Sequence, residues 1–81
     1  MNLPEPHRRF LAELRATRLA RGMTQLQLSD KVRLSRAQYS AIETGRSVVN
    51  LVHLHNLTVV LGVRFMIGET SWPPASDFVT E

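Results

Sequence analysis

The chain has 81 residues, the length of one small domain. It contains no cysteine, which excludes disulfides and cysteine-ligated zinc as sources of stability. All ten lysine and arginine residues lie between positions 7 and 64, where only three acidic residues oppose them and the net charge is +7. Such a basic domain suits a polyanionic partner such as double-stranded DNA.

The sequence shows no sign of a membrane span, an enzyme active site or a metal site. No stretch approaches the ~20 apolar residues of a membrane span, and MNLPEPHRRF lacks the apolar core of a signal peptide, so we expect a soluble cytoplasmic protein. Paired carboxylates, a nucleophile with its base and a phosphate loop are all missing, so we expect neither an enzyme nor a cofactor. His53 and His55 would point to different sides of a helix and have no evident third ligand, so we expect no metal.

The first predicted elements are an arm and a helix. Pro4 and Pro6 predict a flexible N-terminal arm over residues 1–6. From His7 to Arg21 the chain has neither proline nor glycine, apolar residues recur at helical spacing, and Gly22 follows as a stop. We therefore predict a first helix over residues 7–21.

Two capping boxes predict the next two helices. Thr24 followed by Gln27, and Ser35 followed by Gln38, each place a hydroxyl three residues before a glutamine, as at a helix start. The first of these helices ends near Arg33, and the second ends before Gly45.

A fourth helix starts after Asn50 and ends at Gly62. Its apolar stripe consists of Leu51, Leu54, Leu57 and Leu61. The fold class is therefore all-α, and the helices fill a single domain over residues 7–62.

The short spacing between the second and third helices predicts a helix-turn-helix. Such helices cross steeply, and the second can enter the major groove of DNA with its first turn on the base edges. In that turn Arg36 can bind guanine, Ala37 can contact a thymine methyl group, and Gln38 can pair with adenine. Gln25 can present its side chain and backbone N–H to a phosphate.

The span from Leu14 to Val63 resembles the Cro/C1 or Xre-type helix-turn-helix domain of phage repressors, controller proteins and antitoxins. The matching residues are Arg18, GMTQ, Leu28, Val32, LS, IETGR and LGV. The resemblance implies a four-to-five-helix, lambda-repressor-like domain and a buried salt bridge between Arg18 and Glu43. It also implies a DNA-facing set made up of Gln25, Ser35, Arg36, Ala37, Gln38, Ser40 and Ala41, with Arg46 and Ser47 near phosphate.

The chain departs from the family pattern at three positions. Arg33 stands where glycine is usual in the turn, and a left-handed conformation there would cost roughly 1–2 kcal/mol or require a remodelled turn. Ser29 replaces the usual alanine and buries a hydroxyl that needs a backbone partner. Val49 replaces a common proline.

Simpler roles remain open for several of these residues. Arg36 and Arg46 can be solvated surface arginines, and Gln25 and Gln38 can act as helix caps alone. Gln38 cannot cap and pair with a base at once. Tyr39 lies at an apolar position and is expected to pack in the core.

Residues 63–68 predict a strand, because VRFMI is rich in β-branched and aromatic residues and Val63, Phe65 and Ile67 would share one face. With no hairpin partner foreseen in the chain, we expect this strand to pair with its copy across a homodimer. Alternatively, these residues extend the apolar stripe of the fourth helix into the monomer core.

A C-terminal dimer strand resembles the layout of HipB-type antitoxins, which would add a HipA-like toxin kinase as partner. Trp72, in the tail over residues 69–81, would then anchor the dimer or the partner protein, or would only cover the strand. Two functions follow, namely a dimeric repressor that binds a palindromic operator, and an antitoxin whose main work is neutralising an enzyme. Arg36 and Gln25 favour the first, whereas Trp72, Phe78 and the acidic tail favour the second.

Overall fold

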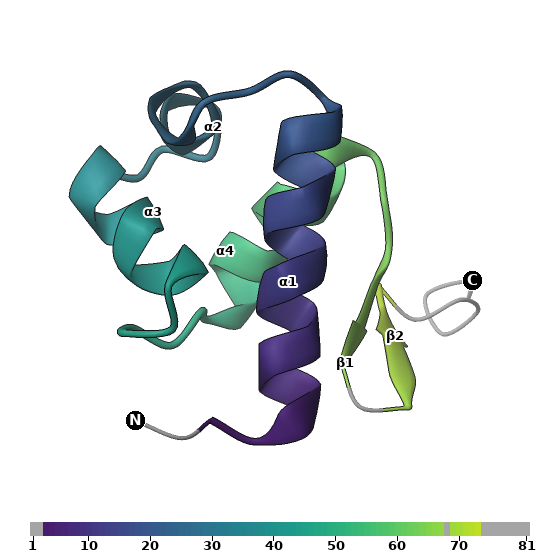
Figure 1. The fold of residues 1–81 in the computed structure, drawn as a ribbon. Helices are drawn as coiled ribbons and strands as arrows, with labels where there is room; N and C mark the ends of the chain where they lie inside the picture. Colours follow the sequence, from purple (N-terminus) through teal and green to yellow (C-terminus); the bar gives the residue numbers. More distant parts are fainter. Residues whose placement is uncertain (1–2, 68, 74–81) are drawn as a thin grey trace.

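The computed structural model describes residues 3–67 and 69–73 of the chain (Figure 1). In this part, four helices precede a small antiparallel hairpin; their bounds are α1 Glu5–Ala20, α2 Gln25–Lys31, α3 Arg36–Glu43, α4 Leu51–Leu61, β1 Phe65–Ile67 and β2 Thr70–Trp72. The mostly helical architecture confirms the predicted fold class. Each helix in the described part is too short or too polar to span a bilayer.

Helix α1 begins earlier than the sequence suggested. Pro4 is its N-cap residue and Pro6 lies in its first turn, where a missing N–H costs nothing because that turn has no intrahelical acceptor for it. The carbonyl of Pro4 accepts a hydrogen bond from the N–H of Arg8 at 3.0 Å. The prediction of a flexible arm over residues 1–6 is therefore wrong for Glu5 and Pro6, and residues 1–2 lie outside the described part.

The turn between α2 and α3 keeps the left-handed conformation in spite of its arginine. Arg33 has φ +62°, and the next residue, Leu34, donates its N–H to the carbonyl of Ser29 at 2.9 Å. The buried hydroxyl of Ser29 donates to the carbonyl of Leu26 at 2.8 Å. The turn is thus not remodelled, and the hydroxyl has the backbone partner that it needed.

The core lies between the four helices and extends under β1. Tyr39 is fully buried, as expected, and Phe65 packs edge-on against Phe10 with ring centroids 5.2 Å apart. The buried apolar side chains are Phe10, Leu11, Leu14, Leu28, Val32, Leu34, Tyr39, Ile42, Leu54, Leu57, Leu61 and Phe65. Phe65 thereby attaches the hairpin to the helical domain.

The hairpin corrects the prediction of an unpaired strand. β1 pairs with β2 in the same chain, with Phe65 opposite Trp72 and Met66 opposite Ser71. Phe65 is fully buried, and Val63 and Trp72 are partly buried against the core, so Phe65 cannot form a dimer surface. The premise that the chain lacks a hairpin partner is wrong. Gly68-Glu69, between the two strands, is a sequence pattern typical of a two-residue hairpin loop and was the signal available.

Candidate nucleic-acid interface

Both predicted capping boxes are present, at the starts of α2 and α3. The hydroxyl of Ser35 accepts the N–H of Gln38 at 3.0 Å, and the Gln38 side-chain oxygen accepts the N–H of Ser35 at 2.9 Å. Thr24 and Gln27 make the same two bonds at 3.0 and 2.9 Å. These reciprocal bonds fix the first turn of α3 and leave Arg36 and Ala37 exposed.

The cap limits how Gln38 can recognise a base. A bidentate pair with adenine needs both the oxygen and the nitrogen of the side-chain amide. The oxygen of Gln38 accepts the Ser35 N–H through one of its two lone pairs, so one acceptor position and both amino hydrogens remain for DNA. The capping bond holds the amide in one orientation and does not by itself exclude the predicted pair with adenine.

Beneath the exposed turn, α1 and α3 are joined by a buried ion pair between Arg18 and Glu43. Nε of Arg18 lies 2.8 Å from Oε2 of Glu43, and Nη2 lies 3.0 Å from Oε1. Nη1 of Arg18 donates to the carbonyl of Met23 at 2.8 Å, and the hydroxyl of Tyr39 donates to Oε2 of Glu43. The parallel arginine–carboxylate bonds are directional, so the network sets the angle of α3 against α1.

The network also changes the pKa values of its members. Burial alone would raise the pKa of Glu43, but hydrogen bonds from Arg18, Tyr39 and Gln25 outweigh it and hold this pKa below its ordinary value. Burial, and then the hydrogen bond to Glu43, raise the pKa of Tyr39. Glu43 therefore stays ionised and Tyr39 stays a hydrogen-bond donor near neutral pH.

Gln25, predicted to face a phosphate, is tied into this network. Its amide nitrogen donates to Oε1 of Glu43 at 3.0 Å, and its side chain is half-buried. An amide nitrogen carries two hydrogens, so one remains to donate. The Glu43 bond holds Gln25 in one place at the start of α2, close to the network that orients α3.

The loop after α3 folds back on the helix. Gly45 has φ +82°, and an added Cβ there would lie 2.7 Å from a methyl group of Leu3. The carbonyl of Ala41 accepts the N–H of Arg46 at 2.8 Å and that of Ser47 at 3.0 Å. The side chains of Arg46 and Ser47 are exposed, while Ser40 and Ala41 are half-buried.

A groove of about 460 Å³ joins α3 to the start of α4. Ala37, Gln38, Ala41 and Ser47, four of the predicted DNA-facing residues, line it together with Leu34, Ile42, Val48, Asn50 and His53. Asn50 and His53 were missed as members of this surface, because the DNA-facing set that the resemblance implies ends at Ser47. The sequence did predict Asn50 at the start of the fourth helix, where its Oδ1 accepts the N–H of His53 at 2.8 Å.

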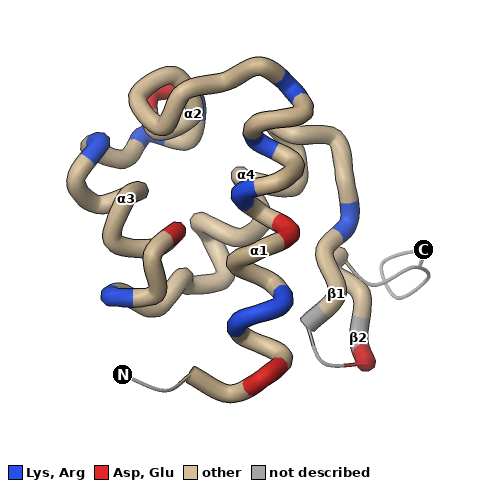
Figure 2. Tube along the Cα trace, viewed as in Figure 1, with Lys and Arg blue, Asp and Glu red and all other residues tan. Residues whose placement is uncertain are grey.

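Basic residues are spread over the described chain except for α4. Lysines and arginines mark α1, α2, the start of α3 and the loop that follows it, whereas α4 carries none (Figure 2). A short turn between α2 and α3, a capped and exposed first turn on α3 and basic residues at both ends of that helix define a helix-turn-helix protein.

Comparison with known families agrees with this class. The sequence model of the Cro/C1-type helix-turn-helix family matches residues 14–66, and the chain belongs to this family. The family supports a DNA-binding transcription regulator in general. No curated protein was found to match the chain.

Proposed function

We propose that the protein is a sequence-specific transcriptional regulator, a dimeric repressor that inserts the N-terminal turn of α3 into the major groove of a palindromic operator. The observation that carries the proposal is the exposed first turn of α3, held by the Ser35–Gln38 capping box above the buried Arg18–Glu43 pair. A rigid turn with an exposed arginine can discriminate base edges, because little conformational entropy is lost on binding.

In this proposal the residues divide into base-reading and phosphate-binding groups. Arg36 donates a bidentate pair to guanine, Ala37 contacts a thymine methyl group, and Gln38 pairs with adenine through its amide. Ser35, Ser40 and Ala41 complete the surface of α3. Gln25, Arg46 and Ser47 position the domain by donating to phosphates, and phosphate contacts of this kind make the affinity fall with salt.

The alternative function is an antitoxin that binds a HipA-like kinase and represses its own operator. It depends on Trp72, Phe78 and the acidic tail. Trp72 is half-buried against the core, which reduces the surface that it can offer to a partner, and residues 74–81 lie outside the described part. Trp72, on which the antitoxin depends, is thus largely engaged with the chain's own core, so we place the repressor first.

The experiment is binding of Arg36→Ala to a fluorescent duplex of the protein's own promoter region, with random duplex as competitor, at two salt concentrations. Loss of one bidentate guanine pair, about 1–3 kcal/mol, weakens specific binding by roughly 5- to 150-fold and leaves random binding nearly unchanged. The matched control is Arg9→Ala. Arg9 is an exposed arginine that lines a surface hollow together with Met66 of β1. Strand β1 lies on the other side of α1 from α3 (Figure 1).

Two results would count against the proposal. If the wild-type protein binds the promoter duplex no more tightly than random DNA, the promoter contains no specific operator. If Arg9→Ala and Arg36→Ala lower the affinity equally, and do so on both duplexes, the binding is explained by non-specific electrostatic attraction alone. Circular dichroism of each variant checks that the fold is intact.

A further inference from the structure

The outer face of α4 is apolar and exposed. Residues 47–63 contain no aspartate, glutamate, lysine or arginine, although charged residues make up 21% of the chain. Leu51, Val52 and Val59 are 64%, 66% and 65% exposed. Exposed apolar residues gathered on one helix face, here with the uncharged His55 between them, are a recognised mark of an interaction surface.

Helix geometry places these side chains on one stripe. At 3.6 residues per turn, Leu51, Val52, His55 and Val59 fall within about 100° around the axis of α4. The buried leucines of α4, which attach the helix to the core, lie on the opposite side. The helix is therefore apolar on both sides, and the domain covers only one of them.

The charge pattern identifies a second copy of the chain as the occupant. In a two-fold symmetric contact each residue faces the same patch on its partner, so any charge near the axis meets its own like charge. The span from 7 to 64 has a net charge of +7, and two such domains repel each other unless they meet through an uncharged face. Within the described part, α4 is the one helix without a charged residue.

The stripe also complements itself. A two-fold axis passing between His55 and Asn56 makes the two α4 helices antiparallel and brings Val52 of each copy opposite Val59 of the other. Leu51 then extends past Val59 toward the end of the partner helix. The two contacts are identical by symmetry, as an isologous interface requires.

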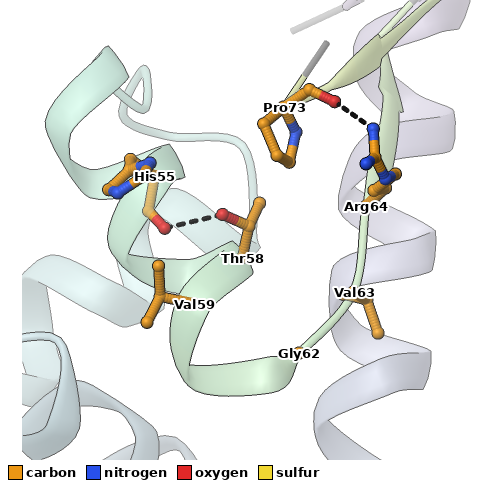
Figure 3. Close-up of a pocket in the computed structure, with 7 residues that line it drawn as sticks. All are labelled: His55, Thr58, Val59, Gly62, Val63, Arg64 and Pro73. Carbon is orange, nitrogen blue, oxygen red and sulfur yellow. Dashed lines mark hydrogen bonds between the residues drawn. The ribbon is translucent and has the colours of Figure 1, made fainter. Parts of the chain in front are cut away.

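Two hollows flank Val59 and can receive the partner's side chains. One, of about 300 Å³, lies between His55, Thr58 and Val59 of α4 and the segment Val63–Arg64 with Pro73 (Figure 3). The other, of about 220 Å³, lies between α4 and the end of α2. Side chains of the partner can insert into such hollows, which gives closer packing than contact between two flat apolar faces.

We propose that the protein dimerises through the outer face of α4, with His55 next to the two-fold axis and Leu51, Val52 and Val59 forming apolar contacts on both sides of it. The inference deepens the proposed repressor, which needs a two-fold dimer, but it can be tested without DNA. It replaces Phe65 of the predicted dimer strand with exposed residues of α4.

The rim of this interface is basic, which gives the dimer a distinctive salt dependence. Lys31 and Arg33 border one hollow and Arg64 borders the other, and all three are exposed. Like charges at the rim repel across the interface, and salt screens that repulsion. Dimerisation is therefore expected to strengthen as salt rises, whereas binding to DNA weakens.

The test is sedimentation equilibrium of the full chain without DNA, at two salt concentrations. Val59→Glu places two carboxylates face to face in an apolar contact and raises the dimer dissociation constant more than ~100-fold. The matched control is Leu19→Glu, which puts the same charge on a residue of α1 that is 53% exposed and leaves the dimer intact. Circular dichroism confirms that both variants remain folded.

A second variant separates this interface from strand pairing. The N–H of Met66 points to Oε1 of Glu13, 3.5 Å away, so its partner Ser71 directs its own N–H to the outer edge of the hairpin. Ser71→Pro removes that edge donor and is expected to leave the dimer intact. A monomeric wild type, an unaffected Val59→Glu dimer, or a dimer broken by Ser71→Pro alone would overturn the proposal. None of these results touches the specific binding by Arg36, which is measured separately.

Discussion

Helices α3 and α4 are attached to the same core by different means. Helix α3 is joined to α1 through the buried Arg18–Glu43 pair, with Tyr39 and Gln25 completing the bonds to the carboxylate. Helix α4 is attached by buried leucines. Its polar tie to the end of α1, among the described residues, is the guanidinium of the C-cap residue Arg21, which donates to the carbonyl of Leu61 at 2.9 and 3.1 Å. Hydrogen bonds between charged groups are directional and apolar contacts are not. The helix that the proposed function places in the DNA groove is thus the one with directional attachments.

The largest expected effect comes from breaking the directional attachment. Arg18→Met leaves the Glu43 carboxylate buried without its counter-ion and is expected to cost about 3–5 kcal/mol in the free energy of unfolding. For a domain of 81 residues this is a large part of the total stability. Urea denaturation followed by circular dichroism measures the change.

A double variant provides the control. Arg18→Met combined with Glu43→Leu removes both charges and is expected to recover most of the lost stability, because no unpaired charge remains buried. If the double variant were as unstable as Arg18→Met, the loss would come from packing and not from the orphaned carboxylate. The double variant should still bind the operator more weakly than the wild type, since the orientation of α3 is no longer fixed by directional bonds.

The attachments of α3 and α4 are also expected to differ in how their contribution to the free energy of unfolding depends on pH. The pKa of Glu43 is lower in the folded chain than in the unfolded chain, where a glutamate titrates near 4.3. Below that pH the unfolded chain binds more protons, so the contribution of Glu43 is complete above about pH 4.3 and is lost as the pH falls through the lower folded pKa. Each unit of depression corresponds to about 1.4 kcal/mol of stability.

The measurement is the free energy of unfolding between neutral pH and pH 3. In Glu43→Gln, the free energy of unfolding should fall less steeply as the pH decreases toward 3. Leu57→Ala, which truncates a fully buried side chain of α4 and costs about 2–5 kcal/mol, should lower the whole curve and keep its slope. If Glu43→Gln loses stability at low pH as steeply as the wild type, other carboxylates cause that loss.

The smallest expected effect concerns the turn that joins α2 to α3. Arg33→Gly relieves a left-handed strain of roughly 1–2 kcal/mol but adds flexibility to the unfolded chain worth about 0.4–1 kcal/mol. A net gain between about 0 and 1.6 kcal/mol is expected in urea denaturation. Arg33→Ala keeps the Cβ and should give no such gain in the free energy of unfolding. An equal gain in Arg33→Ala would show that the charge of Arg33, and not its Cβ, causes the effect.

Local interactions made much of this fold predictable. The starts of α2, α3 and α4 follow from caps between residues three apart, and the end of α4 follows from Gly62, which has φ +69°. The start of α1 was placed too late, because prolines that read as an arm are equally compatible with a first helical turn. The hairpin was missed because β2 has three residues and no alternation of its own. Its pairing becomes favourable only when Phe65 packs on Phe10.

The sequence by itself determined where most helices begin and end, which residues lie on the exposed turn of α3 and where the charge is concentrated, because these depend on near neighbours and on composition. Tertiary structure decided what each side chain does. It assigned Gln25 to Glu43 and the oxygen of Gln38 to its own cap, and it buried Phe65 in the core. Among the described residues, it also left Leu51, Val52 and Val59 of α4 exposed. Such outcomes depend on which elements meet in space, and residues far apart in the chain come together only when the whole core has formed.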